Sequence, residues 1–142
     1  MTVVMYCSKT GHSKKLARAM ADALGVKARR VAEGLPAGPV DRLFLVGGIY
    51  GGHSAPAMLE LARSLTPDRV GRVILATSCT TGITRQDEVR AALRERGVTV
   101  EEQEYLCRGA FLFFLLGHPN REECRAAADF ALRLSREDAP RA

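Results

Sequence analysis

The chain has 142 residues, of which 46% are hydrophobic and 26% are charged. This length fits one domain with one sizeable core, so we expect residues 1–142 to form a single domain without a separate substrate domain. The apolar fraction excludes a disordered chain, and the net charge of +5 bears on the choice of partner.

The N-terminal part of the chain alternates between predicted strands and a helix. Thr2 to Cys7 is a short apolar run rich in β-branched residues, which is typical of a buried strand. Apolar residues then recur at helical spacing from Lys14 to Leu24, and Gly25 is a natural stop for that helix. Val26 to Val31 predicts a second strand, and a loop rich in glycine and proline follows it.

The middle of the chain repeats this alternation. Arg42 to Val46 predicts a third strand, which we expect to end at Gly47 and Gly48. Ser54 is placed to cap a helix from Ala55 to Leu65. Arg72 to Ser78 predicts the fourth strand.

The C-terminal part adds two helices and one strand. Thr84 and Asp87 indicate a cap for a helix that ends at Gly97. Val98 to Leu106 predicts a fifth strand, and its three glutamates indicate an edge position or a solvated face. A last helix is expected from Pro119 or Asn120 to about residue 135.

Five strands that alternate with helices predict an α/β fold, a three-layer sandwich in which helices cover both faces of a parallel sheet. Ligands of such sheets bind beyond the carboxyl ends of the strands. The sequence therefore directs attention to three turns at that edge, which are Ser8–Ser13, Gly47–Ser54 and Cys79–Arg85.

The first of these turns has the composition of a phosphate site. Three hydroxyls, those of Ser8, Thr10 and Ser13, lie on a turn that leads into a helix N-terminus, where backbone N–H groups and the helix dipole favour an anion. Gly11 permits close approach of the backbone to a bound group. The alternative is an ordinary strand-to-helix turn with a hydroxyl cap.

Residues 6–17, Tyr-Cys-Ser-Lys-Thr-Gly-His-Ser-Lys-Lys-Leu-Ala, resemble the opening of the flavodoxin family, a strand followed by Ser/Thr-x-Thr-Gly-x-Thr/Ser and a helix. The resemblance implies a flavodoxin-like sheet of five parallel strands in the order 2-1-3-4-5. It also implies non-covalent binding of flavin mononucleotide (FMN) and electron transfer. The phosphate would be held by Ser8, Lys9, Thr10, Gly11, His12 and Ser13.

The other two turns would surround the flavin ring. The glycine-rich segment after the third strand resembles the family's ring-binding loop, and it offers Gly48, Ile49, Tyr50 and Gly51. Tyr50 either stacks on the ring or is an exposed tyrosine at a loop tip. The turn after the fourth strand offers Ser78, Cys79, Thr80, Thr81 and Gly82 to the polar edge of the ring. This turn departs from the family because it has no second aromatic residue and no acidic residue before Asp87.

Cys79 and Arg85 leave a rival interpretation open. Residues 79–85 match Cys-x-x-Gly-x-x-Arg between a predicted strand and a helix, the arrangement that cysteine phosphatases use to hold a thiolate and a phosphate. Cys79 and Cys107 would also lie on neighbouring strands, as a redox pair or a weak metal site. A third possibility is a flavin-free flavodoxin-like domain that binds a partner.

The resemblance favours an electron-transfer flavoprotein over a stand-alone enzyme, with no catalytic side chain and no metal. The basic charge favours a redox partner with a neutral or acidic surface. Nucleic-acid binding is not expected, because aromatic residues make up only 6% of the chain and no nucleic-acid-binding motif is present.

The apolar run Phe111–Leu116 is far shorter than the roughly 20 residues of a membrane helix. We expect a cytoplasmic protein, since no signal-peptide pattern is seen and no cysteines form a C-x-x-C.

Overall fold

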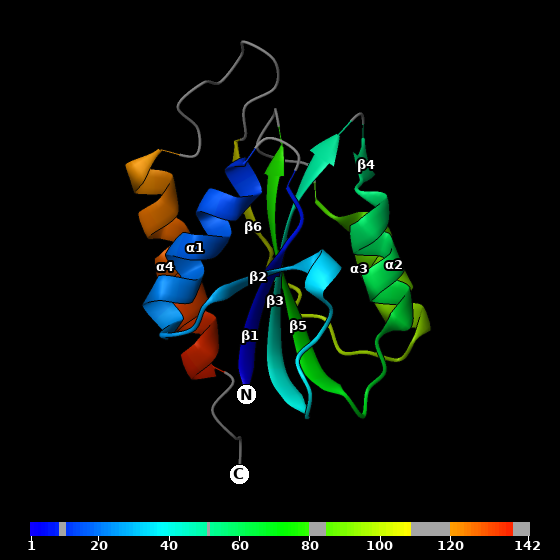
Figure 1. Ribbon diagram of the computed structural model, residues 1–142. Helices are drawn as coiled ribbons and strands as arrows, with labels where there is room; N and C mark the ends of the chain where they lie inside the picture. The colour runs from blue at the N-terminus through cyan, green and yellow to red at the C-terminus, as the bar shows by residue number, and fades with distance from the viewer. Residues whose placement is uncertain (9–10, 51, 80–84, 109–119, 138–142) are drawn as a thin grey trace.

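A parallel sheet lies between two layers of helices (Figure 1). The computed structural model describes residues 1–8, 11–50, 52–79, 85–108 and 120–137. Its strands are β1 (Thr2–Tyr6), β2 (Ala28–Arg30), β3 (Val40–Tyr50), β4 (His53–Ser54), β5 (Val70–Cys79) and β6 (Tyr105–Arg108). Its helices are α1 (His12–Leu24), the 3-10 turn η1 (Val31–Glu33), α2 (Pro56–Ser64), α3 (Asp87–Glu95) and α4 (Arg121–Glu137).

The strand order is β2-β1-β3-β5-β6, and every neighbouring pair in this order is parallel. The additional strand β4 pairs antiparallel with the end of β3 and lies off this path. Counted without β4, the order is the predicted 2-1-3-4-5, so the α/β class and the topology are confirmed. The two-residue strand β4 is a feature that the sequence did not predict.

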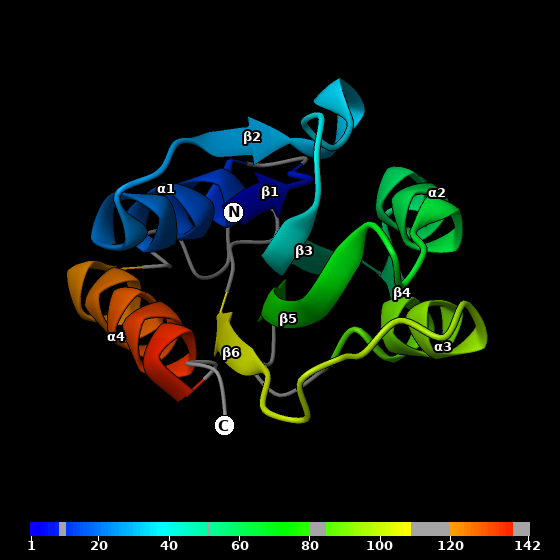
Figure 2. The same ribbon diagram turned by 90° about the horizontal axis from the view of Figure 1, so that it is seen from below.

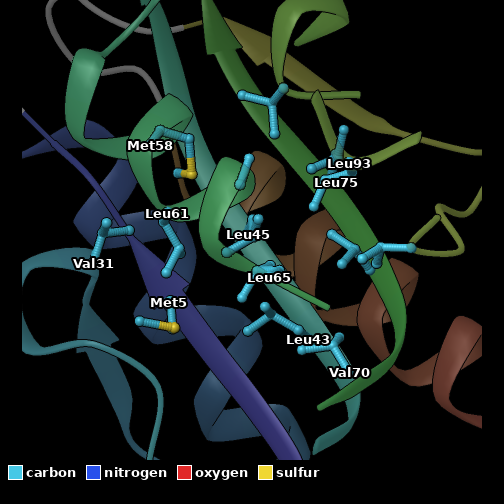
Figure 3. Packing of buried hydrophobic residues seen from close by; sticks show 14 of the residues in the cluster. Met5, Val31, Leu43, Leu45, Met58, Leu61, Leu65, Val70, Leu75 and Leu93 are labelled. Atoms are coloured by element: carbon cyan, nitrogen blue, oxygen red, sulfur yellow. The ribbon is translucent and has the colours of Figure 1, made fainter. Parts of the chain in front are cut away.

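The two faces of the sheet have separate apolar cores, because side chains alternate along each strand. Leu43 and Leu45 of β3 belong to the cluster under α2 and α3, part of which is drawn in Figure 3. Phe44 and Val46 belong to the cluster under α1 and α4. Figure 2 shows these two helix pairs on opposite sides of the sheet. This arrangement confirms the three-layer sandwich.

The third strand is longer than predicted. Its pairing with β5 continues through Gly47 and Gly48, which lie opposite Thr77 and Ser78. The strand continues through the two glycines instead of ending there, because their extended backbone pairs with that of β5. Gly52, in the turn to β4, has a φ of +82° that favours glycine.

Two sequence-based assignments near α2 and β6 are wrong. Ser54 does not cap α2, because the N-cap is Ala55 and the backbone N–H of Ser54 donates to Glu88 Oε1 (2.9 Å). Of the predicted strand from Val98 to Leu106, the part before Tyr105 makes only one isolated bridge, between Val100 and Val73.

Local residues determine the end of α1 and the start of α4. Gly25 ends α1 with a left-handed φ of +72°, as predicted. The Asn120 side chain accepts a hydrogen bond from the Glu123 backbone N–H (2.8 Å), and the Glu123 carboxylate accepts one from the Asn120 N–H (3.0 Å). This reciprocal pair fixes the start of α4. Among the described residues, no helix is long and apolar enough to cross a bilayer.

Candidate functional site

Three segments from distant parts of the sequence meet at the carboxyl edge of the sheet. The backbone N–H of Cys7 donates to the Val46 carbonyl (3.1 Å), which places the turn after β1 beside the end of β3. Gly48 of β3 lies in register with Ser78 of β5. The structure therefore brings the beginnings of all three predicted turns together.

The turn after β1 leads into α1 through Gly11. Gly11 is the N-cap of α1 with a φ of +86°, and its N–H donates to Ser8 Oγ (2.9 Å). Ser8 accepts through an oxygen lone pair, so its O–H remains able to donate to another group. A Cβ built on Gly11 would meet no atom within 4 Å, so the space beside this turn is open.

The start of α1 is electrostatically suited to an anion. The helix has no side-chain hydrogen bond at its cap and no acidic residue in its first turn. The first N–H groups of a helix have no partner within the helix, and the dipole adds a partial positive charge there. The half-buried His12 and the partly exposed Lys14 belong to this first turn.

Ser13 links this turn to β5. Its side chain is buried, and its Oγ lies 3.5 Å from Ser78 Oγ, at the long limit of a hydrogen bond. Two residues that the sequence assigned to different parts of the site are thus neighbours under the carboxyl edge. Their hydroxyls face each other inside the protein.

Part of the predicted site is not described. Lys9, Thr10, Gly51, Thr80, Thr81 and Gly82 lie outside the described residues, as does the apolar run Phe111–Leu116. Tyr50 is described only as the last residue of β3, opposite His53. Ile49 pairs with Ser54 and is partly buried.

A buried carboxylate lies behind the turn that follows β5. The Glu104 side chain is only 1% exposed. It accepts hydrogen bonds from Thr77 Oγ1 (2.5 Å), the Gln86 backbone N–H (2.8 Å) and Arg90 Nη2 (2.9 Å). The glutamates predicted an edge position or a solvated face. The edge position is confirmed, because β6 is the last strand of the sheet. A solvated face holds for Glu102, whose side chain is 74% exposed, but not for Glu104.

Gln86 completes this network from the start of α3. Its Nε2 donates to the Ala76 carbonyl (3.1 Å) and to Thr77 Oγ1 (3.0 Å). A Cβ on Gly47 would lie 3.1 Å from Gln86 Oε1, so a side chain at this position would crowd the amide. The network ties together the end of β5, the start of α3 and the segment before β6. Sequence reasoning missed it, because Glu104 looks like its exposed neighbours and nothing local distinguishes it.

The arginine of the rival interpretation contacts the segment before β6. Arg85 Nη2 donates to the Glu102 carbonyl (2.6 Å), and its Nε lies 3.5 Å from Glu104 Oε1. A phosphatase arginine would instead keep its guanidinium available for two parallel hydrogen bonds to a phosphate. The geometry of Arg85 therefore disfavours phosphate-ester chemistry.

Cys79 and Cys107 lie on neighbouring strands but face opposite sides of the sheet. Cys107 is in register with Ser78, so Cys79, one residue further along, points the other way. A disulfide needs Cβ atoms that face each other, and a redox pair is disfavoured. Burial is also the main reason that the pKa of Cys107 is raised to about 12. The described residues hold no cluster of three or more metal-ligating side chains.

Solved structures similar to this chain include several flavodoxins. Oxidised flavodoxin 2 from Bacillus cereus is 16% identical with a TM-score of 0.73, over 96% of this chain and 98% of that one. The flavodoxin of Streptococcus pneumoniae TIGR4 is 15% identical with a TM-score of 0.69, over 96% and 98% of the two chains. An archaeal flavodoxin is 10% identical with a TM-score of 0.68, over 98% and 99%. No protein-family model and no curated protein matches the sequence. Together with the sheet order, these similarities show that the chain has the flavodoxin-like fold.

Proposed function

We propose that this protein binds FMN non-covalently at the carboxyl edge of the sheet and takes part in electron transfer. The observation that carries this proposal is the open, uncapped start of α1 beside Ser8, next to the paired ends of β3 and β5. Ligands of parallel α/β sheets bind at this edge. The bound flavin would supply the redox chemistry.

The donor set at the first turn fits a phosphate. The Ser8 hydroxyl and the first N–H groups of α1 offer donors and a positive dipole, and the first turn of the helix has no carboxylate. Lys9, Thr10, His12 and Ser13 complete the proposed phosphate site. The buried position of Ser13 favours a role of its backbone N–H over its hydroxyl.

The ring would lie against the ends of β3 and β5. Gly48 has no side chain there, and Ser78 beside it is buried with its hydroxyl toward α1. The backbone at these positions would therefore contact the flavin. Ile49, Tyr50 and Gly51 would cover one side of the ring, and residues Cys79, Thr80, Thr81 and Gly82 would line its polar edge.

The partner is proposed to carry a neutral or acidic surface. Exposed cations lie on α1 and around β2, among them Lys15, Arg18, Lys27 and Arg30. The elements that carry these residues adjoin one another, because α1 packs on β1 and β2 pairs with β1 (Figure 1). An acidic partner would associate faster on this side because of the opposite charges.

A titration with FMN and with riboflavin, followed by flavin absorbance and fluorescence, tests the proposed site. Riboflavin lacks the phosphate, so we expect it to bind much more weakly than FMN. Ser8→Ala and Thr10→Ala should weaken FMN binding and leave riboflavin binding unchanged. Lys15→Ala is the matched control for general positive charge. Equal affinity for the two flavins, or equal effects of Thr10→Ala and Lys15→Ala, would contradict the phosphate site.

A further inference from the structure

The end of β3 turns back and forms a short hairpin with β4. Ile49 pairs with Ser54, and Tyr50 pairs with His53. Gly52 lies in the turn, with a φ of +82° that favours glycine. This β3–β4 hairpin carries Tyr50, which is proposed above to cover the flavin ring, so the position of the hairpin decides where this part of the site lies.

Glu88, in the first turn of α3, contacts the hairpin from a distant part of the sequence. Its Oε1 accepts a hydrogen bond from the Ser54 backbone N–H (2.9 Å). The same oxygen lies 3.4 Å from Nδ1 of His53. The pairing between β3 and β4 spans only two residues on each strand, and a two-stranded hairpin on its own is marginally stable. The hairpin therefore depends on Glu88 for part of its stability.

The backbone hydrogen bond is the main part of this contact. It is the largest cause of the lowered pKa of the Glu88 carboxyl, which burial opposes and which His53 and Arg63 lower further. The ion pair with His53 is exposed at the surface, where such pairs contribute little. Ser54 is only 5% exposed, so its N–H would have limited access to water without the carboxylate.

The start of α3 also holds the end of β5. Gln86, the N-cap of this helix, donates from its Nε2 to the Ala76 carbonyl (3.1 Å) and to Thr77 Oγ1 (3.0 Å). Glu88 lies two residues further along the same helix. Figure 2 shows β4 beside α2 and α3. The first turn of α3 therefore positions both the hairpin and the end of β5, the two parts of the sheet proposed to contact the ring.

We propose that Glu88 is a positioning residue for the flavin ring. It acts through the Ser54 N–H, which fixes the β3–β4 hairpin before the flavin binds and so lowers the ordering cost of binding. The inference rests on the proposed function, because it concerns the same site. It goes beyond that function because Glu88 belongs to a helix outside the three turns at the carboxyl edge.

FMN titrations of two Glu88 variants test this role. Glu88→Ala removes the acceptor, so the hairpin must become ordered when the flavin binds, and we expect FMN to bind roughly tenfold more weakly. Glu88→Gln retains a carbonyl oxygen that can accept from Ser54, and it should restore most of the affinity. Glu95→Ala removes an exposed carboxylate at the other end of α3 and should leave FMN binding unchanged.

Two further measurements separate positioning from other roles. Because FMN and riboflavin share the ring, Glu88→Ala should weaken the binding of both by the same factor, whereas Ser8→Ala should weaken FMN binding alone. Hydrogen exchange at the Ser54 amide, measured without flavin, should be faster in Glu88→Ala than in Glu88→Gln or the unmodified protein. Thermal unfolding shows that each variant is folded under the conditions of the titration.

The outcomes separate this proposal from the proposed function. If the unmodified protein binds FMN, an unchanged FMN affinity in Glu88→Ala overturns the positioning role and leaves the proposed function in place. A loss in Glu88→Gln as large as that in Glu88→Ala has the same meaning. Binding of neither flavin by the unmodified protein overturns the proposed function, and the positioning role falls with it.

Discussion

Replacing Glu104 with alanine tests whether the buried network holds the carboxyl edge together. The change removes the acceptor of three groups, which are the Thr77 hydroxyl, the Gln86 N–H and the Arg90 guanidinium. The Arg90 side chain is only 6% exposed, so its charge would remain buried without this carboxylate. Breaking a buried ion pair costs roughly 3–5 kcal/mol, and we expect a loss of about 4 kcal/mol in the free energy of unfolding.

Urea denaturation followed by circular dichroism measures this loss. With a slope of about 2 kcal/mol per molar urea, the midpoint should fall by about 2 M. Glu102→Ala is the matched control, because Glu102 pairs with Arg94 at the surface, where both side chains are more than half exposed. Such a pair contributes at most about 1 kcal/mol. A loss for Glu104→Ala no larger than that for Glu102→Ala would refute the reasoning.

Two further predictions concern the same end of the sheet. In Gly47→Ala, the new Cβ would lie 3.1 Å from Gln86 Oε1 and from the terminal methyl of Met58, so we expect a loss of about 1–3 kcal/mol in urea denaturation. An unchanged urea midpoint would show that the Gln86 amide moves aside without cost and would contradict this prediction. The second prediction is a pH dependence. Because burial raises the pKa of Cys107 from 9.0 to about 12, its protonated thiol favours the folded state, and this contribution is lost as the pH rises from 9 to 12. The stability of Cys107→Ala should fall less steeply over this range, and an identical slope would contradict the assignment.

The sheet could be predicted from the sequence because each central strand is a short apolar segment that can be recognised locally. The segments around Val4, Phe44 and Ile74 are apolar on both faces of the sheet, and glycine or polar turns separate them from the helices. The end of β3 was harder to predict. Gly47 and Gly48 read as a turn by composition, yet their pairing with β5 keeps the chain extended. Long-range pairing of this kind has no local signature.

The candidate site also has one part that the sequence predicts and another part that depends on long-range contacts. Ser8, Gly11 and the start of α1 form a local motif, so the sequence predicts their arrangement. Glu104 is different, because its burial depends on groups from Thr77, Gln86 and Arg90 that only the folded chain brings together.

The most direct test of the account is a two-dimensional amide spectrum of the labelled protein recorded during addition of FMN. The account predicts saturable shifts at the carboxyl edge, at the amides of Ser8, Gly11, Gly48 and Ser78. The amides of Arg133 and Leu134, in the last turns of α4, should not change. The absence of saturable shifts at high micromolar FMN would contradict the central claim, as would shifts confined to another part of the molecule.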